Sequence, residues 1–373
     1  MNKIQIIISN YDDIQNPYYG GGGAFAVHEV AKRLARRFTV TVLTGNYFSA
    51  KKSEVIDGIA YRRIGLSFVG PKLGQLLFHL ALVWHVRRRS FDCWIESFTP
   101  PTSTSLLPLF TDKPVIGLVH MLAGEDMRRK YFLPFDKLET WGLQMYTQCI
   151  VTSELFRQKI IEKNPKIHVV VIPNGVNTPS LVSQDSTREY VLFLGRIEVD
   201  QKGLDLLLRA YSLARETIRI PLVIAGTGTE NEMKKLHKLI SGLGLEGSVQ
   251  LVGKINGDSA KKELFQKAVV CVISSRFETF SIVALESMAS STPLIAFDID
   301  GLRWIPVGVC AKIPPYDIDL LAQELIQCQR DAGTCRDLVN EGNLFVAHYD
   351  WDAISEKYYR YIRQVLTQQQ RVT

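Results

Sequence analysis

Ala268–Ala289 has the sequence AVVCVISSRFETFSIVALESMA, and this stretch decides the fold. It begins with a continuous apolar run, Ala268–Ile273, which is typical of a strand buried on both faces of a parallel sheet. From Ile282 to Ala289 the apolar residues recur at helical spacing. The pattern predicts a strand, a loop and a helix in succession, and open α/β sheets built from such units bind ligands beyond the carboxyl ends of their strands.

Two carboxylates flank the predicted start of this helix. Glu278 falls in the loop, and Glu286 falls about one turn into the helix. Backbone N–H groups at a helix start attract anions, and carboxylates accept hydrogen bonds from hydroxyl groups. Taken alone, the pair could also be a general acid and a general base. A phosphate flanked by sugars fits this arrangement well.

The composition is that of a globular protein with enough apolar residues for two or three domains. Of its 373 residues 46% are hydrophobic, and its six cysteines include no Cys-x-x-Cys pair, which favours buried thiols and a reducing compartment. The first residues lack the pattern of a secretory signal. The longest apolar tract, Leu73–Val86, is interrupted by polar residues and is shorter than the roughly 20 residues that span a bilayer. We therefore expect a cytoplasmic protein.

The excess of positive over negative charge lies entirely in the first half of the chain. Residues 1–180 contain 22 Lys and Arg against 14 Asp and Glu, whereas residues 181–373 contain 22 and 24. The basic clusters are either solvated faces or contacts with an anionic acceptor or membrane surface. The helical pattern Leu73–Arg89 ends in three arginines, so it is either an ordinary helix packed on a sheet or a peripheral attachment to the inner face of a membrane.

Strands and helical patterns alternate along both halves of the chain, which is the order that builds parallel sheets. In the first half, strands are expected at 4–9, 40–44, 93–95, 115–120 and 149–152, and helices at 26–38 and 73–89. In the second half, strands are expected at 190–194, 222–225, 249–251, 268–273 and 293–296, and helices at 204–214, 230–239, 282–289 and 351–366, with a frayed tail at 368–370. The polar stretch 178–187 separates the halves. The chain is therefore predicted to be an α/β protein of two Rossmann-like, doubly wound domains facing a cleft.

Two other strand-to-helix loops carry glycine or positive charge. Gly20–Gly23 precedes the first helix, where glycine lets the backbone approach a ligand, although a flexible loop is the alternative. After the strand 190–194, Arg196 and Lys202 could together neutralise a diphosphate without a metal ion, although a solvated loop is the alternative.

Single residues after other strands are further candidates. Gly226 lies in another strand-to-helix turn, and Lys254 follows a strand end that could face a nucleobase. His120 ends the strand 115–120, either as a substrate contact or as a structural residue. Asp298-Ile299-Asp300 has the spacing of a metal motif but looks like a turn, and no His/Cys cluster has zinc spacing. No metal ion or other cofactor is expected.

Together these motifs resemble the GT-B glycosyltransferases of family 4, a retaining group that uses nucleotide sugars. The resemblance covers nearly the whole chain, and it rests on the order and spacing of the motifs. It implies domains at 1–177 for the acceptor and 178–348 for the nucleotide sugar, and a helical segment, 349–373, that crosses back to the first domain. The motifs are Gly21-Gly22, His120, Ile172–Asn177, Gly195-Arg196 with Lys202-Gly203, Ala225–Gly228, Glu278 with Glu286, and Trp351-Asp352-Ala353-Ile354.

The resemblance implies a role for each matching residue. Arg196 and Lys202 are expected to neutralise the donor diphosphate, Glu278 to hold the transferred sugar and Glu286 to hold the ribose. His120 is expected near the reacting carbon. The remaining donor contacts are expected from Gly21, Gly22, Gly23, Gly195, Gly226 and Lys254 and from the backbone of Phe280, Ser281, Ile282 and Val283.

The resemblance predicts a hexosyltransferase that moves a hexose from a UDP-linked donor to a glycan or a lipid-linked acceptor, in polysaccharide or glycolipid biosynthesis. Nucleic acid is not an expected partner. Thr279, Ser281 and Ser291 stand where the family often has glycine, and the Arg196-to-Lys202 spacing is one residue longer than the commonest form. These differences affect loop geometry rather than charge. A sugar-nucleotide epimerase and a non-catalytic protein that binds nucleotide sugars or polysaccharides are the alternatives.

Overall fold

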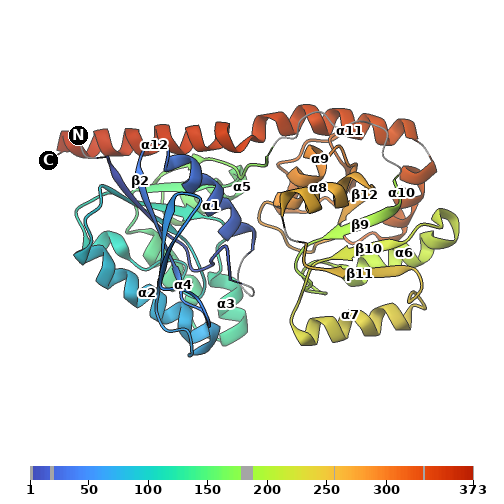
Figure 1. The fold of residues 1–373 in the computed structure, drawn as a ribbon, viewed down its shortest axis with the longest axis horizontal. Coiled ribbons are helices and arrows are strands. Elements are labelled where there is room, and N and C mark those ends of the chain that lie inside the picture. The colour runs from blue at the N-terminus through green and yellow to red at the C-terminus, as the bar shows by residue number, and fades with distance from the viewer. Residues whose placement is uncertain (1–2, 17–20, 178–187, 256, 331, 373) are drawn as a thin grey trace. The chain divides into compact units, whose positions relative to one another are not determined.

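The computed structural model describes residues 3–16, 21–177, 188–255, 257–330 and 332–372. The chain forms two compact units (Figure 1). Unit 1 combines Met1–Asn174 with Trp351–Thr373, and unit 2 is Gly175–Asp350. The predicted divisions after residues 177 and 348 lie close to these limits. Gly20 and the polar stretch 178–187 lie outside the described residues.

Unit 1 is built on a largely parallel sheet. Its described strands follow the order β3-β4-β2-β1-β5-β6-β7-β8, and only β3 and β4 are antiparallel neighbours. Strands β2 and β5 pair with opposite edges of β1, so the order of the strands reverses at β1. This reversal creates a topological switch point at the carboxyl end of β1. The strands are β1 Gln5–Ser9, β2 Thr39–Gly45, β3 Ser53–Ile56, β4 Ile59–Ile64, β5 Cys93–Ser97, β6 Val115–Val119, β7 Gln148–Val151 and β8 His168–Val171. The α-helices are α1 Gly22–Leu34, α2 Gly70–Arg88, α3 Gly124–Tyr131, α4 Phe135–Leu143, α5 Glu154–Lys163 and α12 Trp351–Val372.

Unit 2 has a second sheet, in which all described neighbours are parallel. Its order is β11-β10-β9-β12-β13-β14. Here β9 lies between β10 and β12, so the switch point is at the carboxyl ends of β9 and β12. The strands are β9 Tyr190–Leu194, β10 Leu222–Ala225, β11 Val249–Gly253, β12 Ala268–Ile273, β13 Leu294–Phe297 and β14 Ala311–Ile313. The α-helices are α6 Leu204–Ile218, α7 Glu230–Gly242, α8 Asp258–Gln266, α9 Ile282–Ala289, α10 Ile318–Arg330 and α11 Ala332–Val346.

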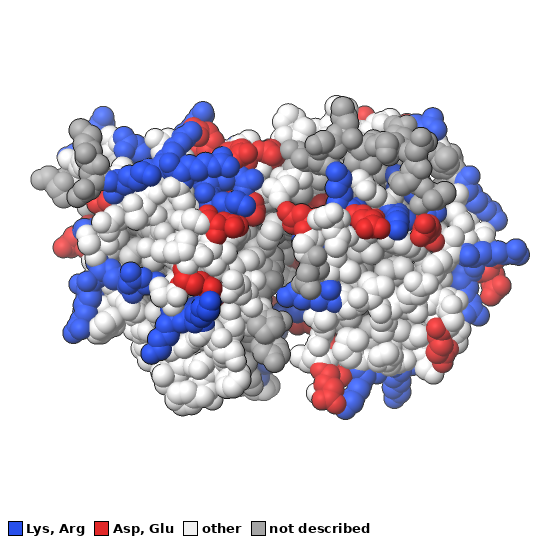
Figure 2. All heavy atoms as spheres, viewed as in Figure 1, with Lys and Arg blue, Asp and Glu red and all other residues white. Residues whose placement is uncertain are grey.

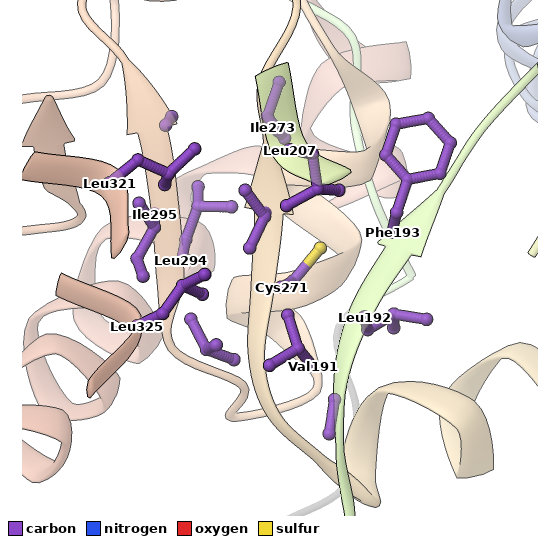
Figure 3. Packing of buried hydrophobic residues seen from close by; sticks show 14 of the residues in the cluster. Val191, Leu192, Phe193, Leu207, Cys271, Ile273, Leu294, Ile295, Leu321 and Leu325 are labelled. Atoms are coloured by element: carbon purple, nitrogen blue, oxygen red, sulfur yellow. The ribbon is translucent and has the colours of Figure 1, made fainter. Parts of the chain in front are cut away.

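The core of unit 2 explains why its strands could be predicted. Val191, Leu192 and Phe193 of β9 are buried, as is Cys271 of β12. Figure 3 shows these side chains with those of β13 and with Leu207, Leu321 and Leu325 from the helices α6 and α10. Because helices cover both faces of the sheet, every residue of such a strand is apolar and the run is continuous.

The final helix, α12, belongs to unit 1 and packs on α1 (Figure 1). Its predicted apolar stripe is confirmed as buried. The stripe consists of Trp351, Ile354, Tyr358, Tyr361, Ile362 and Val365. Two arginines of the first unit, Arg33 and Arg36, donate to Asp352 at 2.9 Å. The helix continues to Val372, so the frayed tail expected at 368–370 is wrong. No proline or glycine stops it, and Gln369 Nε2 donates to the carbonyl of Asp112 at 2.9 Å.

The predicted fold class is confirmed, and the main correction concerns the first helix. Helix α1 begins at Gly22, four residues before the expected start, so Gly22 and Gly23 lie in a helical turn rather than in a loop. Gly21 is its N-cap, with extended backbone angles. Glycine is a poor helix former, which hid this turn from the sequence pattern. Among the described residues, no helix combines the length and apolarity needed to cross a bilayer.

Candidate functional site

The loop between β12 and α9 carries both predicted carboxylates at the switch point of unit 2. Glu278 lies in this loop and Glu286 in the second turn of α9, as expected. No side chain caps the helix at Ser281, so backbone N–H groups of the first turn stay available to an anion.

Contacts behind the loop fix its shape. Trp304 Nε1 donates to the carbonyl of Phe280 at 2.7 Å, and the two rings stack with centroids 4.2 Å apart. A Cβ on Gly301 would lie 1.8 Å from the carbonyl oxygen of Glu278, so only glycine fits there. The backbone of Glu278 is therefore fixed by close packing against Gly301, and its side chain remains available for contacts with other residues.

Lys202 and Glu278 form the centre of the site. Lys202 Nζ lies 2.6 Å from Glu278 Oε1, which also accepts a hydrogen bond from Ser275 Oγ at 2.8 Å. Only 18% of the Lys202 side chain and 11% of the Glu278 side chain are exposed. Gly203 permits this approach, because its φ is +60° and a Cβ there would lie 1.9 Å from the carbonyl oxygen of Ser274. The structure thus brings together two predicted residues that are 76 positions apart.

Arg196 lies on the same β9–α6 loop but has a different partner. Its guanidinium is 3.2 Å from Glu198, and 59% of the side chain is exposed. A long side chain with this exposure can change rotamer at little cost. Arg196 is therefore held less firmly than Lys202.

Glu286 pairs with a lysine that the sequence did not single out. Lys261 Nζ of α8 lies 2.7 Å from Glu286 Oε1. Both side chains of this pair are largely buried. Glu286 lies within α9, whereas Glu278, the partner of Lys202, lies in the loop before this helix.

A second unpredicted pair is Arg276 with Asp205, which make two hydrogen bonds of 2.7 Å. Burial opposes ionisation of Asp205, but the bonds and charge of Arg276 outweigh it and lower the pKa of Asp205.

The remaining residues predicted in unit 2 divide into structural and exposed positions. Gly226 has a φ of +145°, and a Cβ there would lie 1.8 Å from the carbonyl oxygen of Gly195, so close backbone packing requires glycine at 226. A Cβ on Gly195 would make only an ordinary contact of 3.5 Å with the ring of Phe193. Lys254 follows β11 and is exposed. Ser281 has a positive φ of 68° and Ser291 one of 55°, whereas Thr279 is not among the positive-φ residues.

In unit 1, the fold brings His120 close to helix α1, whose first turn contains Gly22 and Gly23. His120 comes directly after β6, and a small cavity of about 10 Å³ is lined by His120, by Ala26 of α1 and by Tyr358 of α12. Burial lowers the pKa of His120 to about 4, so its imidazole is neutral near pH 7. Its Nε2 is buried without a hydrogen-bond partner in the part of the chain that the structure describes.

Packing against the described residues of unit 1 does not require glycine at the start of α1. Among those residues, a Cβ on Gly21 or Gly23 would meet no atom within 4 Å, and neither glycine has a positive φ. Space above the backbone is what a ligand or another segment would need.

Comparison with known proteins places the chain in a family. Residues 20–179 match the family model described as Glycosyltransferase Family 4, and residues 182–345 match the one described as Glycosyl transferases group 1. A phosphatidyl-myo-inositol mannosyltransferase from Mycobacterium leprae is 31% identical over 69% of this chain and 69% of its own length. The chain belongs to the GT-B glycosyltransferases of family 4 type.

Other relatives of this glycosyltransferase agree over shorter stretches or in fold alone. An uncharacterized glycosyltransferase from Methanocaldococcus jannaschii is 32% identical over 58% of this chain, and the match spans 60% of that protein. The solved structure of sucrose-phosphate synthase from Thermosynechococcus elongatus shares the fold with a TM-score of 0.81 and 21% identity over 98% of this chain and 100% of that one. Anabaena HepE, solved in complex with UDP-glucose, has a TM-score of 0.76 and 16% identity over 97% of this chain and 100% of that one.

The aspartates with metal-motif spacing have other partners in this glycosyltransferase. Asp298 pairs with Lys312 at 3.2 Å, and Asp300 pairs with Arg303 at 3.0 Å in a short 3₁₀ turn. Among the described residues, no group of three or more His, Cys, Asp or Glu side chains could hold a metal ion. The short 3₁₀ turn covers Asp300–Leu302, so it begins at the last residue of the turn expected at 298–300.

Proposed function

We propose that this glycosyltransferase is a retaining hexosyltransferase that uses a UDP-linked hexose. The observation that carries the proposal is the arrangement around the start of α9, where Lys202 and Glu278 stand before the helix and Glu286 stands within it. An anion at the helix start would have a carboxylate on either side. A nucleoside diphosphate sugar has this order of groups: hydroxyls, diphosphate, hydroxyls.

The diphosphate is proposed to lie at the first turn of α9, where Lys202 reaches it. In the structure Lys202 is neutralised by Glu278 and Arg196 by Glu198. Binding of the donor would therefore exchange these internal partners for phosphate oxygens. Two cations and the helix start supply the positive charge, so the proposal requires no metal ion.

The two carboxylates are proposed to bind different ends of the donor. Glu278 would accept hydrogen bonds from hydroxyls of the hexose, and Glu286 from hydroxyls of the ribose. The fold shared with HepE, which was solved with UDP-glucose, supports the choice of donor class.

Transfer is proposed to occur on the face from which the nucleotide departs. The bond between the sugar carbon and the diphosphate oxygen breaks, the acceptor oxygen bonds to that carbon, and the acceptor proton passes to the departing phosphate oxygen. Negative charge grows on the diphosphate, so Lys202 and the N–H groups of α9 would stabilise the transition state more than the ground state. Arg196 would add a second cation.

The acceptor is proposed to be a glycan or a lipid-linked glycan. The mycobacterial relative is named as a mannosyltransferase of phosphatidyl-myo-inositol, which supports an acceptor of the lipid-linked class.

We also propose that unit 1 attaches to the cytoplasmic face of a membrane through α2. Leu73, Leu76, Leu80 and Trp84 form a stripe on this helix with exposures between 43% and 60%.

The surroundings of this stripe support an anionic lipid surface. The opposite face of α2 is also apolar and is buried through Phe78, Leu82 and Val86, so the helix packs on the sheet and still leaves an apolar stripe outside. Arg88 lies over the ring of Trp84 at 4.5 Å. On the face drawn in Figure 2, Lys and Arg side chains of unit 1 gather mainly along its upper edge, with Asp and Glu side chains beside them.

A thermal-shift screen tests the donor. UDP, GDP, ADP and their sugars are compared at equal concentration, and a ligand that binds the native state raises the midpoint by mass action. We expect the largest shift from UDP and a UDP-hexose. A larger shift from GDP or ADP would contradict the choice of base.

Product analysis then separates the candidate activities. NMR spectroscopy of the product's anomeric proton should show the anomeric configuration of the donor, and inversion would contradict the retaining mechanism. A changed hexose still attached to the nucleotide, in the absence of acceptor, would favour the epimerase. Donor binding without transfer or hydrolysis across an acceptor panel would favour a non-catalytic binding protein.

A further inference from the structure

Unit 1 has an open hollow of about 390 Å³, and none of the residues that line it belongs to the site described above. Its walls come from α3, α4 and the last residue of α5. The volume falls within the range of small-molecule sites, roughly 300 to 1,000 Å³. The side chains that matter for its chemistry are Glu125, Asp136, Lys137, Trp141, Gln144 and Lys163.

One wall is an exposed indole. Trp141 lines the hollow with 46% of its surface accessible, while Gly142 and Leu143 beside it on α4 are buried. An indole offers a flat apolar face and one N–H donor. A sugar ring has a flat face of C–H groups with hydroxyls around its rim, so the two surfaces are complementary.

One polar group at the hollow lacks a partner. Asp136 Oδ1 is buried and has no hydrogen-bond donor among the described residues, and Oδ2 is 3.5 Å from Arg128. A buried acceptor without a donor costs about 1–3 kcal/mol. Because Oδ1 is closed to solvent, a ligand in the hollow would reach the other carboxylate oxygen of Asp136, and the amide of Gln144 offers both a donor and an acceptor on the same helix.

Most of the charged side chains around the hollow are paired. Glu125 lies 3.9 Å from Arg129, Asp136 lies 3.5 Å from Arg128, and Lys163 Nζ lies 2.8 Å from Glu139. Paired charges attract a phosphate or a cation less strongly than an unpaired charge does. The chemistry favours a neutral ligand with many hydroxyl groups.

The walls are held in place by a single buried carboxylate. Glu139 is 1% exposed, and besides Lys163 it accepts from the backbone N–H of Gly124 at 2.8 Å and from Ser103 Oγ at 2.6 Å. It therefore ties α3, α4 and α5 together at the hollow. A site formed before its ligand arrives loses less conformational entropy on binding.

We propose that this hollow is a glycan-binding subsite, which holds one neutral sugar residue of the acceptor against Trp141. The inference rests on the proposed transfer to a glycan acceptor, but it concerns a separate surface. It gives the enzyme a second hold on the acceptor, remote from the reacting hydroxyl, so a longer glycan would bind more tightly than a short one.

The test measures binding of neutral gluco- and manno-oligosaccharides of two to six residues to the full chain, by saturation-transfer NMR. Trp141→Ala is compared with Leu138→Ala, an exposed apolar residue on the same helix that does not line the hollow. UDP binding is followed in the same samples. We expect Trp141→Ala and Asp136→Asn to weaken oligosaccharide binding at least tenfold, while Leu138→Ala and the affinity for UDP stay unchanged.

The outcomes separate the subsite from the donor proposal. UDP binding without oligosaccharide binding, or oligosaccharide binding that survives Trp141→Ala, would overturn the subsite and leave the donor proposal standing. Oligosaccharide binding that depends on Trp141, without any binding of UDP or another nucleotide, would support the subsite and overturn the donor proposal. Loss of vesicle binding in Trp141→Ala would make the indole a lipid contact and would also overturn the subsite.

Discussion

Glu278 and Glu286 are both carboxylates near the start of α9, but each pairs with a different lysine. Glu278 is bonded to the lysine that the diphosphate would need, whereas Glu286 is bonded to Lys261 on α8. A change at Glu278 therefore disturbs the charge around the reacting bond, while a change at Glu286 removes a hydrogen-bond acceptor for the nucleotide. This difference can be measured as a separation of turnover from affinity.

Glu286→Ala is expected to weaken nucleotide binding by about tenfold or more, because a hydrogen bond to a charged group contributes roughly 1.5–3 kcal/mol. Isothermal titration with UDP measures the change. Lys261→Ala is the matched control, since it breaks the same ion pair and leaves the carboxylate in place. Equal losses in the two variants would mean that Glu286 acts only by holding Lys261.

Ser281→Gly is expected to stabilise unit 2 by up to about 1 kcal/mol. A side chain at positive φ costs roughly 1–2 kcal/mol, and the greater freedom of glycine in the unfolded chain offsets part of the gain. Thr279→Gly, two residues earlier and without a positive φ, should destabilise by about 0.5–1 kcal/mol. Denaturant unfolding compares them, and destabilisation by both changes would contradict the account.

At this scale the sequence predicts the charged groups better than their partners. Lys202, Glu278 and Glu286 lie around the switch point of unit 2 as expected. The pairs Arg276–Asp205 and Glu286–Lys261 could not be predicted, because each joins loops or helices that meet only in the folded sheet. The glycine at 203 was a usable signal, since it marks where one loop touches another.

Among the elements, β5 carries a buried carboxylate with an unusual titration. Glu96 is 1% exposed, and its carboxyl accepts from the Ser105 N–H at 2.6 Å and from the Tyr146 hydroxyl. Burial raises the pKa of Glu96 to about 7, from an ordinary value of 4.5, and the hydrogen bonds oppose the shift. The native state thus holds this proton more tightly than the unfolded chain does.

Stability should therefore fall as pH rises through this range. The contribution of Glu96 is complete below pH 4.5 and is lost as pH rises through about 7. Glu96→Gln stays neutral at every pH, so its stability relative to the natural chain should grow between pH 5 and pH 8, by about 3 kcal/mol at most. Melting curves of both proteins at several pH values measure this, and parallel curves would show that Glu96 does not titrate in this range.

Helix α2 gives a prediction for the membrane proposal. The double change Leu76→Asp with Leu80→Asp should reduce co-sedimentation with phosphatidylglycerol vesicles at least tenfold, because burying each leucine contributes roughly 1.5–3 kcal/mol. Leu213→Asp on α6 of unit 2, also an exposed leucine, should have no effect. The proposal fails if the natural chain does not bind these vesicles at low salt, or if the double variant binds as well as it does.

The elements differ in how well their sequences reveal them. The bounds of β9, β10, β12 and α9 agree with the sequence pattern because both faces of this sheet are covered and the strands are continuous apolar runs. The hairpin β3–β4 was not predicted, although Asp57-Gly58 at its turn is a hairpin signal with positive φ at both residues. Arg63 hides the strand pattern of β4, because an arginine in a sequence is usually taken for a surface residue. In the structure its side chain is fully buried and lies 2.8 Å from Asp13.

In the whole molecule, each unit places its candidate residues at the switch point or the strand ends of its own sheet. Unit 1 is completed by the end of the chain, since α12 buries its stripe there and joins α1 through Arg33 and Asp352. The sequence could predict this helix from its spacing, and its destination followed only from the family resemblance.

The turnover of Lys202→Ala tests the central claim most directly. UDP release is measured at saturating concentration of the donor found in the thermal-shift screen, with Lys235→Ala as the control, because Lys235 is an exposed lysine of α7 paired with Glu232. We predict that Lys202→Ala lowers turnover by about 10² or more, the scale of losing a transition-state donor, while the control stays near normal. Near-normal turnover in Lys202→Ala would contradict the account.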